Sequence, residues 1–224
     1  MPTIHTVEQG EFLAKIAGMY GYSDCRAIWD HPENAALKAR RKSPNVLFPG
    51  DQLFIPDREV KEVPGSTEQR HRFQVKLQRL KLIIFVEDIN DEPIADALCF
   101  FVIDGDPLPM RTDGAGKVER DITPRARRGE LNFTERKIKH QLLIGHLNPI
   151  QAEDDPTDPP PQTEDRFSGQ RARLNNLGYF AGFDEKNEKQ LRWAVEEFQC
   201  DQKLKVTGIM DQQTKAKLEE VYGC

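Results

Sequence analysis

No apolar run in this sequence approaches the roughly 20 residues that a membrane-spanning helix needs, so we expect no insertion into a membrane. Cysteine is also scarce. The four cysteines, Cys25, Cys99, Cys200 and Cys224, are dispersed and form no Cys-x-x-Cys pair. This spacing is not typical of a disulfide scaffold, and it predicts reduced, buried thiols.

Catalytic signatures are missing as well. The patterns HExxH, GxSxG and the P-loop do not occur, and no cysteine stands in a context typical of a nucleophile. Of the five histidines, His31 lies beside Asp30 and Glu33, but Pro32 places this cluster in a turn, which favours a polar loop. His140 and His146 have no cysteine or carboxylate at metal-ligand spacing. The sequence therefore assigns no catalytic residue, no metal site and no cofactor.

The formal net charge is -5 and the isoelectric point is near 5.6. Neutralising phosphates requires a basic surface, so we expect no nucleic-acid partner. The first residues, MPTIHTVEQGEFL, lack the basic and apolar regions of a secretory signal. We therefore expect synthesis in the cytoplasm, and action elsewhere only after delivery.

Proline, glycine and charge runs divide the chain into three predicted domains. The polar stretch 58–72 contains Pro64-Gly65-Ser66, and the stretch 149–169 is acidic and rich in proline, which favours a semi-rigid spacer of polyproline II type. The predicted boundaries are a first domain at 1–57, a linker at 58–72, a second domain at 73–148, a linker at 149–169 and a third domain at 170–224.

For the first domain, the sequence predicts the order strand, helix, helix, strand. Apolar residues from Phe12 to Tyr20 keep helical spacing, a second helix turns Ile28 and Trp29 inward, and a short polar helix runs through Arg41. Pro49 presets φ for a turn and Gly50 takes positive φ at low cost, so we expect a reversal at 49–51. After it, Leu53 and Ile55 share one face of a strand.

The residues Thr6 to Glu11, Asn34, and Pro49-Gly50-Asp51-Gln52-Leu53 with Ile55-Pro56 resemble the LysM (lysin motif) family. This resemblance implies a βααβ module that binds peptidoglycan or other glycans containing N-acetylglucosamine. The implied groove lies between the first strand–helix loop and the loop before the last strand. Its glycan-binding residues would be Gly10, Glu11 and Phe12 on one side and Val46, Leu47, Phe48 and Pro49 on the other. The alternative is that Phe12, Leu47 and Phe48 fill a small core.

A basic run at Lys38, Arg40, Arg41 and Lys42 stands next to this implied groove. It either attracts the carboxylates of peptidoglycan stem peptides or forms a solvated helix face.

In the second domain the apolar residues no longer follow helical spacing. Phe73, Val75 and Leu77 alternate with polar residues, and the segments 82–86 and 99–103 are short apolar runs, which predicts an antiparallel β-sandwich. Asp113-Gly114-Ala115-Gly116 predicts a hairpin-type turn, followed by a half-buried strand with Val118, Arg120 and Ile122. The order Val86-x-Asp88, Asp91-x-Pro93 and Thr112-Asp113-x-x-Gly116 resembles transthyretin-like or carboxypeptidase-regulatory-like domains, which implies a non-catalytic spacer or docking surface.

For the third domain, the sequence again predicts helices. Gly178 breaks a helix that carries Leu174, an apolar stripe runs from Leu191 to Phe198, and Asp211 caps a final helix. The segments RLNNLGYF at 173–180, AVEEFQ at 194–199 and LKVTGIMDQQT at 204–214 resemble the three-helix domain PG_binding_1. This resemblance implies that the domain binds peptidoglycan.

The expected fold class is therefore multidomain α+β: a βααβ LysM-like module, an antiparallel β-sandwich and a three-helix peptidoglycan-binding-like domain. The architecture resembles an accessory of a type VI secretion spike or a phage-tail baseplate. We expect a non-catalytic, multivalent peptidoglycan-binding adaptor that acts at the cell wall or periplasm after delivery by a secretion machine or lysis, with a spike or tail protein as a further partner. Two alternatives stay open: a wall-targeted hydrolase or toxin with a catalytic middle domain, and a structural assembly protein whose glycan binding is lost.

Overall fold

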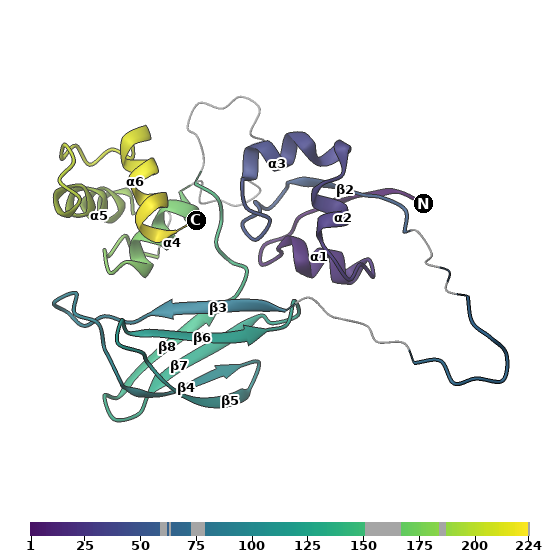
Figure 1. The fold of residues 1–224 in the computed structure, drawn as a ribbon. Helices are drawn as coiled ribbons and strands as arrows, with labels where there is room; N and C mark the ends of the chain where they lie inside the picture. Colours follow the sequence, from purple (N-terminus) through teal and green to yellow (C-terminus); the bar gives the residue numbers. More distant parts are fainter. Residues whose placement is uncertain (59–61, 63, 73–78, 151–166, 184–186, 224) are drawn as a thin grey trace. The chain divides into compact units, whose positions relative to one another are not determined.

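The structure, a computed structural model, describes residues 1–58, 62, 64–72, 79–150, 167–183 and 187–223 (Figure 1). Within them the chain is mixed α+β, with six α-helices and antiparallel sheets, which confirms the predicted class. Spatial proximity groups the chain into two compact units. Unit 1 comprises Met1–Thr3, Leu13–His31 and Ile55–His146, and unit 2 comprises Ile4–Phe12, Pro32–Phe54 and Leu147–Cys224. The domain boundaries given above stay predictions.

Unit 1 contains two antiparallel sheets (Figure 1). The first pairs β3 (Leu80–Phe85) with β6 (Lys117–Ile122). The second has the order β5-β4-β7-β8, formed by β5 (Asp106–Arg111), β4 (Leu98–Ile103), β7 (Arg128–Phe133) and β8 (Ile138–Leu143). Alternate residues of β4 and β7 are buried, namely Cys99, Phe101, Ile103, Leu131 and Phe133. The Arg120 guanidinium of β6 donates to the Phe101 carbonyl of β4 and forms an ion pair of 2.6 Å with Asp106 of β5, so side chains link the two sheets.

The turn at 113–116 forms, but the predicted hairpin does not. The Gly116 amide donates to the Asp113 carbonyl at 3.0 Å, and Gly116 has a φ of +70°, as a tight turn requires. The strands on either side belong to different sheets, because β5 pairs with β4 and β6 pairs with β3. The turn therefore carries the chain from one sheet to the other.

Two helices also belong to unit 1. In α1 (Leu13–Met19) the buried residues are Leu13, Ala14, Ile16 and Ala17, and in α2 (Arg26–Trp29) they are Ile28 and Trp29, as the helical spacing predicts. Asp24 accepts the Arg26 amide at 2.9 Å at the start of α2, and its salt bridge to the Arg26 guanidinium holds the pKa of Asp24 below its usual value.

Unit 2 begins with short elements around the turn at 48–51. A 3-10 helix η1 (Pro32–Asn34) leads into α3 (Ala35–Arg41). The strands β1 (Thr3–Thr6) and β2 (Gln52–Ile55) form a two-stranded sheet, and all their residues except Thr3 and Ile55 belong to this unit. The Asp51 amide donates to the Phe48 carbonyl at 3.0 Å and Gly50 has a φ of +99°, which confirms the predicted reversal. Leu53 and Ile55 are buried and Gln52 is exposed, as the alternation predicts.

The remainder of unit 2 is helical, with α4 (Ser168–Asn176), α5 (Glu188–Asp201) and α6 (Gln212–Tyr222). Gly178, with a φ of +91°, follows the end of α4, and Asp211 caps α6 by accepting the Thr214 amide at 2.8 Å, as predicted. The predicted strand at 73–77 and most of the spacer at 149–169 lie outside the described residues.

The thiol prediction is confirmed for two cysteines and wrong for a third. Cys25 and Cys99 are buried and form no disulfide, and burial raises the pKa of the Cys99 thiol, whereas Cys200 at the end of α5 is exposed. Cys224 lies outside the described residues. None of the described helices is both long enough and apolar enough to cross a bilayer.

Candidate functional site

The C-terminal helices share one apolar core. The stripe of α5 meets α4 and α6 in a cluster of eight buried residues, namely Leu174, Ala181, Leu191, Ala194, Val195, Phe198, Met210 and Leu218. Tyr179 packs edge-on against Phe198, with ring centroids 5.5 Å apart. The Arg173 side chain is also buried: it donates to the Gly169 carbonyl at 2.9 Å and lies over the Tyr222 ring at 5.5 Å. These contacts make a rigid base for the loops.

The loop from α4 to α5 is held by side chains of α4. The Asn175 side-chain amide binds it at two points: Oδ1 accepts the Ala181 amide at 2.8 Å, and Nδ2 donates to the Gly182 carbonyl at 2.9 Å. Arg171 donates to the Ala181 carbonyl, and Ala181 is fully buried. Gly182 has a φ of +75°, in the region that favours glycine. The backbone at residues 181 and 182 is therefore held against α4.

The loop from α5 to α6 is held by Gln199, whose side chain is fully buried. Its Oε1 accepts the amides of Thr207 at 2.8 Å and Gly208 at 3.0 Å. Its Nε2 donates to the Ile209 carbonyl and to the Thr214 hydroxyl, each at 2.9 Å. The Thr214 hydroxyl in turn donates to Asp211 at 2.7 Å, so one network joins α5, the loop and the cap of α6.

Several large apolar side chains of this region are exposed, namely Phe180, Phe183, Trp193, Val206 and Ile209. Phe180 and Phe183 are 60% and 86% exposed and contact each other edge to face, with centroids 6.0 Å apart and an interplanar angle of 75°. Exposed apolar side chains that contact each other, as these two do, are candidates for a binding surface.

Residues 170–218 match the family model described as "Putative peptidoglycan binding domain", PG_binding_1. The matched range contains most of α4, the whole of α5 and the first part of α6, with both loops. No significant match to the chain was found among curated proteins or among solved structures. The match supports a cell-wall-binding role with peptidoglycan as the partner. We refer to residues 170–218 below as the peptidoglycan-binding domain.

The residues assigned to a glycan groove near the N-terminus are brought together in unit 2. The Val7 amide donates to the Asp51 carbonyl and the Gly50 amide donates to the Val7 carbonyl, both at 2.9 Å, so the two loops lie side by side. All seven groove residues are buried, namely Gly10, Glu11, Phe12, Val46, Leu47, Phe48 and Pro49. The side chains of Phe12, Val46, Leu47 and Phe48 are only 2% to 7% exposed. This burial favours the interpretation that Phe12, Leu47 and Phe48 fill a small core.

The carboxylate of Glu11 forms hydrogen bonds to residues that lie close to it in the chain. Its carboxylate accepts the Glu8 amide at 3.0 Å and contacts His5 Nε2 at 2.8 Å, so it closes the loop between β1 and α1. Asn34 has a similar task, because its side-chain amide exchanges two hydrogen bonds of 2.8 Å with the backbone of Phe54. Asn34 is part of the motif that resembles LysM, and its side chain ties η1 to β2.

The basic run divides into two parts. Lys38 and Lys42 are exposed, but Arg41 is buried and forms a two-point ion pair with Asp51, Nε to Oδ2 and Nη2 to Oδ1, each at 2.8 Å. Asp51 Oδ2 also accepts the Phe48 amide at 2.8 Å. The interpretation of Arg41 as part of a solvated or ligand-attracting face is therefore wrong.

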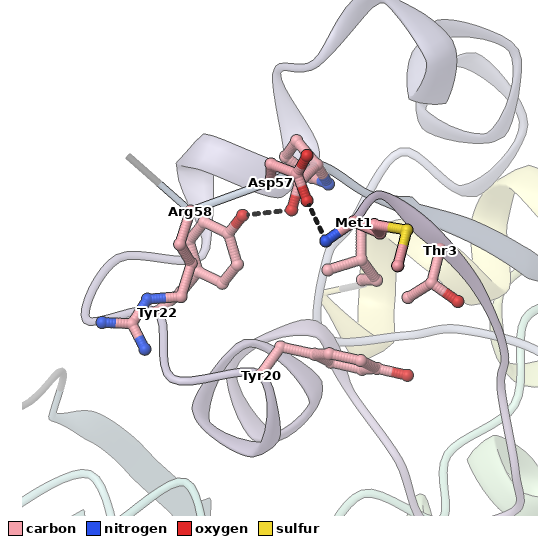
Figure 2. Close-up of a pocket in the computed structure, with 8 residues that line it drawn as sticks. Met1, Thr3, Tyr20, Tyr22, Asp57 and Arg58 are labelled. Carbon is pink, nitrogen blue, oxygen red and sulfur yellow. Dashed lines mark hydrogen bonds and ion pairs between the residues drawn. The ribbon is translucent and has the colours of Figure 1, made fainter. Parts of the chain in front are cut away.

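A pocket of about 500 Å³ lies within unit 1 (Figure 2). Its lining consists of Met1, Thr3, Tyr20, Tyr22, Ile55, Pro56, Asp57 and Arg58. The Tyr22 hydroxyl donates to the Pro56 carbonyl at 2.6 Å, and the N-terminal amine of Met1 pairs with Asp57 at 2.5 Å. Its lining includes the aromatic side chains of Tyr20 and Tyr22 and the charged side chains of Asp57 and Arg58. The described residues include no group of three or more His, Cys, Asp or Glu side chains that could hold a metal ion.

The Asp211 cap should make the stability of the peptidoglycan-binding domain depend on pH. The hydrogen bonds from Thr214 lower the pKa of Asp211, so its contribution is present above the unfolded value of 3.8 and is lost as pH falls through the lower folded value. We expect Asp211→Ala to cost about 1 kcal/mol at pH 7 and progressively less below pH 4. Denaturant unfolding of the full chain at several pH values measures this. Asp211→Asn keeps the cap without its titration, so a pH dependence equal to wild type in that variant would contradict the assignment.

Proposed function

We propose that this protein is a non-catalytic adaptor that attaches to peptidoglycan through its C-terminal domain. The match of residues 170–218 carries the proposal. It is supported by the complete apolar core of α4, α5 and α6 and by the two loops that Asn175 and Gln199 hold in place. A domain with an ordered core and fixed loops presents its exposed groups to a repeating polymer at little further entropic cost.

The proposal includes a second contact with the wall through the first domain, as its resemblance to LysM implies. Two weak sites on one chain raise the effective concentration of the second site, so overall attachment can exceed either affinity by about 10²–10⁴. The sheets of unit 1 then serve as the spacer or docking surface. Docking on a secretion spike or a phage-tail baseplate belongs to this proposal, by resemblance of the module order.

One observation favours a different role for the first domain. The apolar groove residues are buried, and burial leaves little of these side chains to cover a sugar. In this second candidate the first domain serves protein assembly, and only the C-terminal domain contacts the wall.

Co-sedimentation of the purified full chain with intact sacculi tests the proposal. We expect the protein in the pellet and no soluble muropeptides in the supernatant. Absence from the pellet would overturn the wall-binding role. Release of muropeptides would instead support a hydrolase, since PG_binding_1 domains often stand beside catalytic domains. Failure to sediment together with recovery of a spike or tail protein in a pull-down would support the assembly role.

A further inference from the structure

Phe180 and Phe183 form an exposed aromatic pair in the segment between α4 and α5. The two side chains flank Ala181, which is fully buried and anchors the loop in the core. Both rings are exposed, and they contact each other edge to face. An exposed phenylalanine adds little to the stability of a folded domain, so two in contact at one loop favour a contact with a ligand.

Hydrogen bonds from α4 hold the backbone between these two rings. Asn175 binds the backbone at Ala181 and at Gly182, and Arg171 donates to the Ala181 carbonyl, so three hydrogen bonds from α4 fix the two residues between the phenylalanines. A Cβ built on Gly182 would lie 3.4 Å from Gln190 Cβ, which shows that the loop also lies against α5. A surface that is ordered before binding loses little conformational entropy when a ligand arrives.

We propose that Phe180 and Phe183 form an aromatic platform that binds the apolar face of an N-acetylated sugar in the glycan strand. This inference rests on the proposed function. The C–H groups on one face of a pyranose are weakly positive, and the face of a phenyl ring is electron-rich, so stacking satisfies both. Two rings set 75° apart can contact a sugar ring and its neighbouring N-acetyl methyl group.

The other exposed apolar loop of the domain supplies a matched control. Ile209 is 61% exposed, close to the value for Phe180, but it is aliphatic. The neighbouring Gly208 lies against Arg192 and Glu196, whereas Gly182 lies against Gln190. Residues 190 and 192 are about 200° apart around a helix, so the two loops lie on different sides of α5.

The test measures binding isotherms of the full chain on intact sacculi and on glycan strands from which an amidase has removed the stem peptides. We expect the double variant Phe180→Ala, Phe183→Ala to lose roughly tenfold or more in affinity on both materials, as truncation of an aromatic anchor typically does. Phe183→Leu keeps apolar area without a ring and should lose affinity, whereas Phe180→Tyr should retain it. Ile209→Ala should bind as wild type does. Because both phenylalanines are exposed, the variants should unfold at the wild-type temperature.

The possible outcomes distinguish failure of the aromatic platform from failure of the proposed wall-binding function. If wild type binds and the double variant binds equally well, the platform is overturned and the wall-binding role stands. Loss of wild-type binding on removal of the stem peptides overturns the sugar as the ligand. If wild type does not bind sacculi at all, the proposed function fails and the platform fails with it.

Discussion

Replacement of Arg41 by alanine is expected to destabilise the fold around the turn at 48–51 by about 3–5 kcal/mol. The side chains of Arg41 and Asp51 are only 3% and 0% exposed, and their two hydrogen bonds of 2.8 Å satisfy both charges. Removal of the guanidinium leaves the carboxylate buried with the Phe48 amide as a donor. An uncompensated buried charge costs far more than the intact pair contributes, which explains the size of the effect.

Amide hydrogen exchange of the full chain, followed in peptides that cover residues 48–55, measures the free energy of local opening. Lys38→Ala is the matched control, because Lys38 is an exposed cation on the same helix and its replacement should change this free energy by less than about 0.5 kcal/mol.

The double variant Arg41→Met, Asp51→Asn removes both charges and keeps an acceptor for the Phe48 amide, so it should recover most of the lost protection. Equal protection of wild type and Arg41→Ala would show that the ion pair does not hold the turn.

The local signals in the sequence were enough to predict the helices of the C-terminal region, whereas the peptidoglycan-binding domain was inferred from a family resemblance. Gly178 after α4, Asp211 before α6 and the apolar spacing of α5 each act within a few residues, and each appears in the structure where the sequence places it. The same holds for the turn at Pro49-Gly50. Backbone preferences and capping depend on near neighbours, which is why these features can be read from the chain.

Contacts between distant residues could not be read in the same way. Arg41 stands in a basic run and Asp51 in a turn, and only folding brings them to 2.8 Å. Strand β5 was not predicted, because Pro107 and Pro109 interrupt the expected pattern. Among the described strands β5 pairs only with β4, and an edge strand tolerates prolines that cannot donate a hydrogen bond.

The candidate site also combines features that the sequence predicts with features that depend on the folded structure. Phe180 belongs to a recognisable motif, and Phe183 does not, yet the pair is defined only by the loop geometry that Asn175 imposes. A signal was present in the sequence: Gly178 precedes Phe180 by two residues, Gly182 directly precedes Phe183, and both glycines take positive φ. Glycines at this spacing indicate a loop whose backbone conformation is specified, and exposed aromatic residues within such a loop are candidates for ligand contact.

Replacement of Gln199 is expected to have the largest effect on the peptidoglycan-binding domain. Gln199→Ala removes the acceptor of the Thr207 and Gly208 amides and the donor to the Ile209 carbonyl and the Thr214 hydroxyl. A buried group left without its partner costs about 1–3 kcal/mol, so we expect a loss of about 3 kcal/mol or more. Hydrogen exchange in peptides covering 204–212 of the full chain measures it. Gln213→Ala, at an exposed glutamine of α6, should leave the exchange unchanged.

Because a hydrogen-bond network joins Gln199 to Asp211 through Thr214, replacement of one residue should also affect the other. The Thr214 hydroxyl accepts from Gln199 and donates to Asp211, so each bond polarises the other, and the cap loses orientation when Gln199 is removed. A double-mutant cycle of Gln199→Ala and Asp211→Ala should therefore give a coupling energy of about 0.5–3 kcal/mol rather than additive losses. Strict additivity would mean that the loop and the cap are held independently. A coupled result would mean that the α5–α6 loop and the start of α6 open together as one unit.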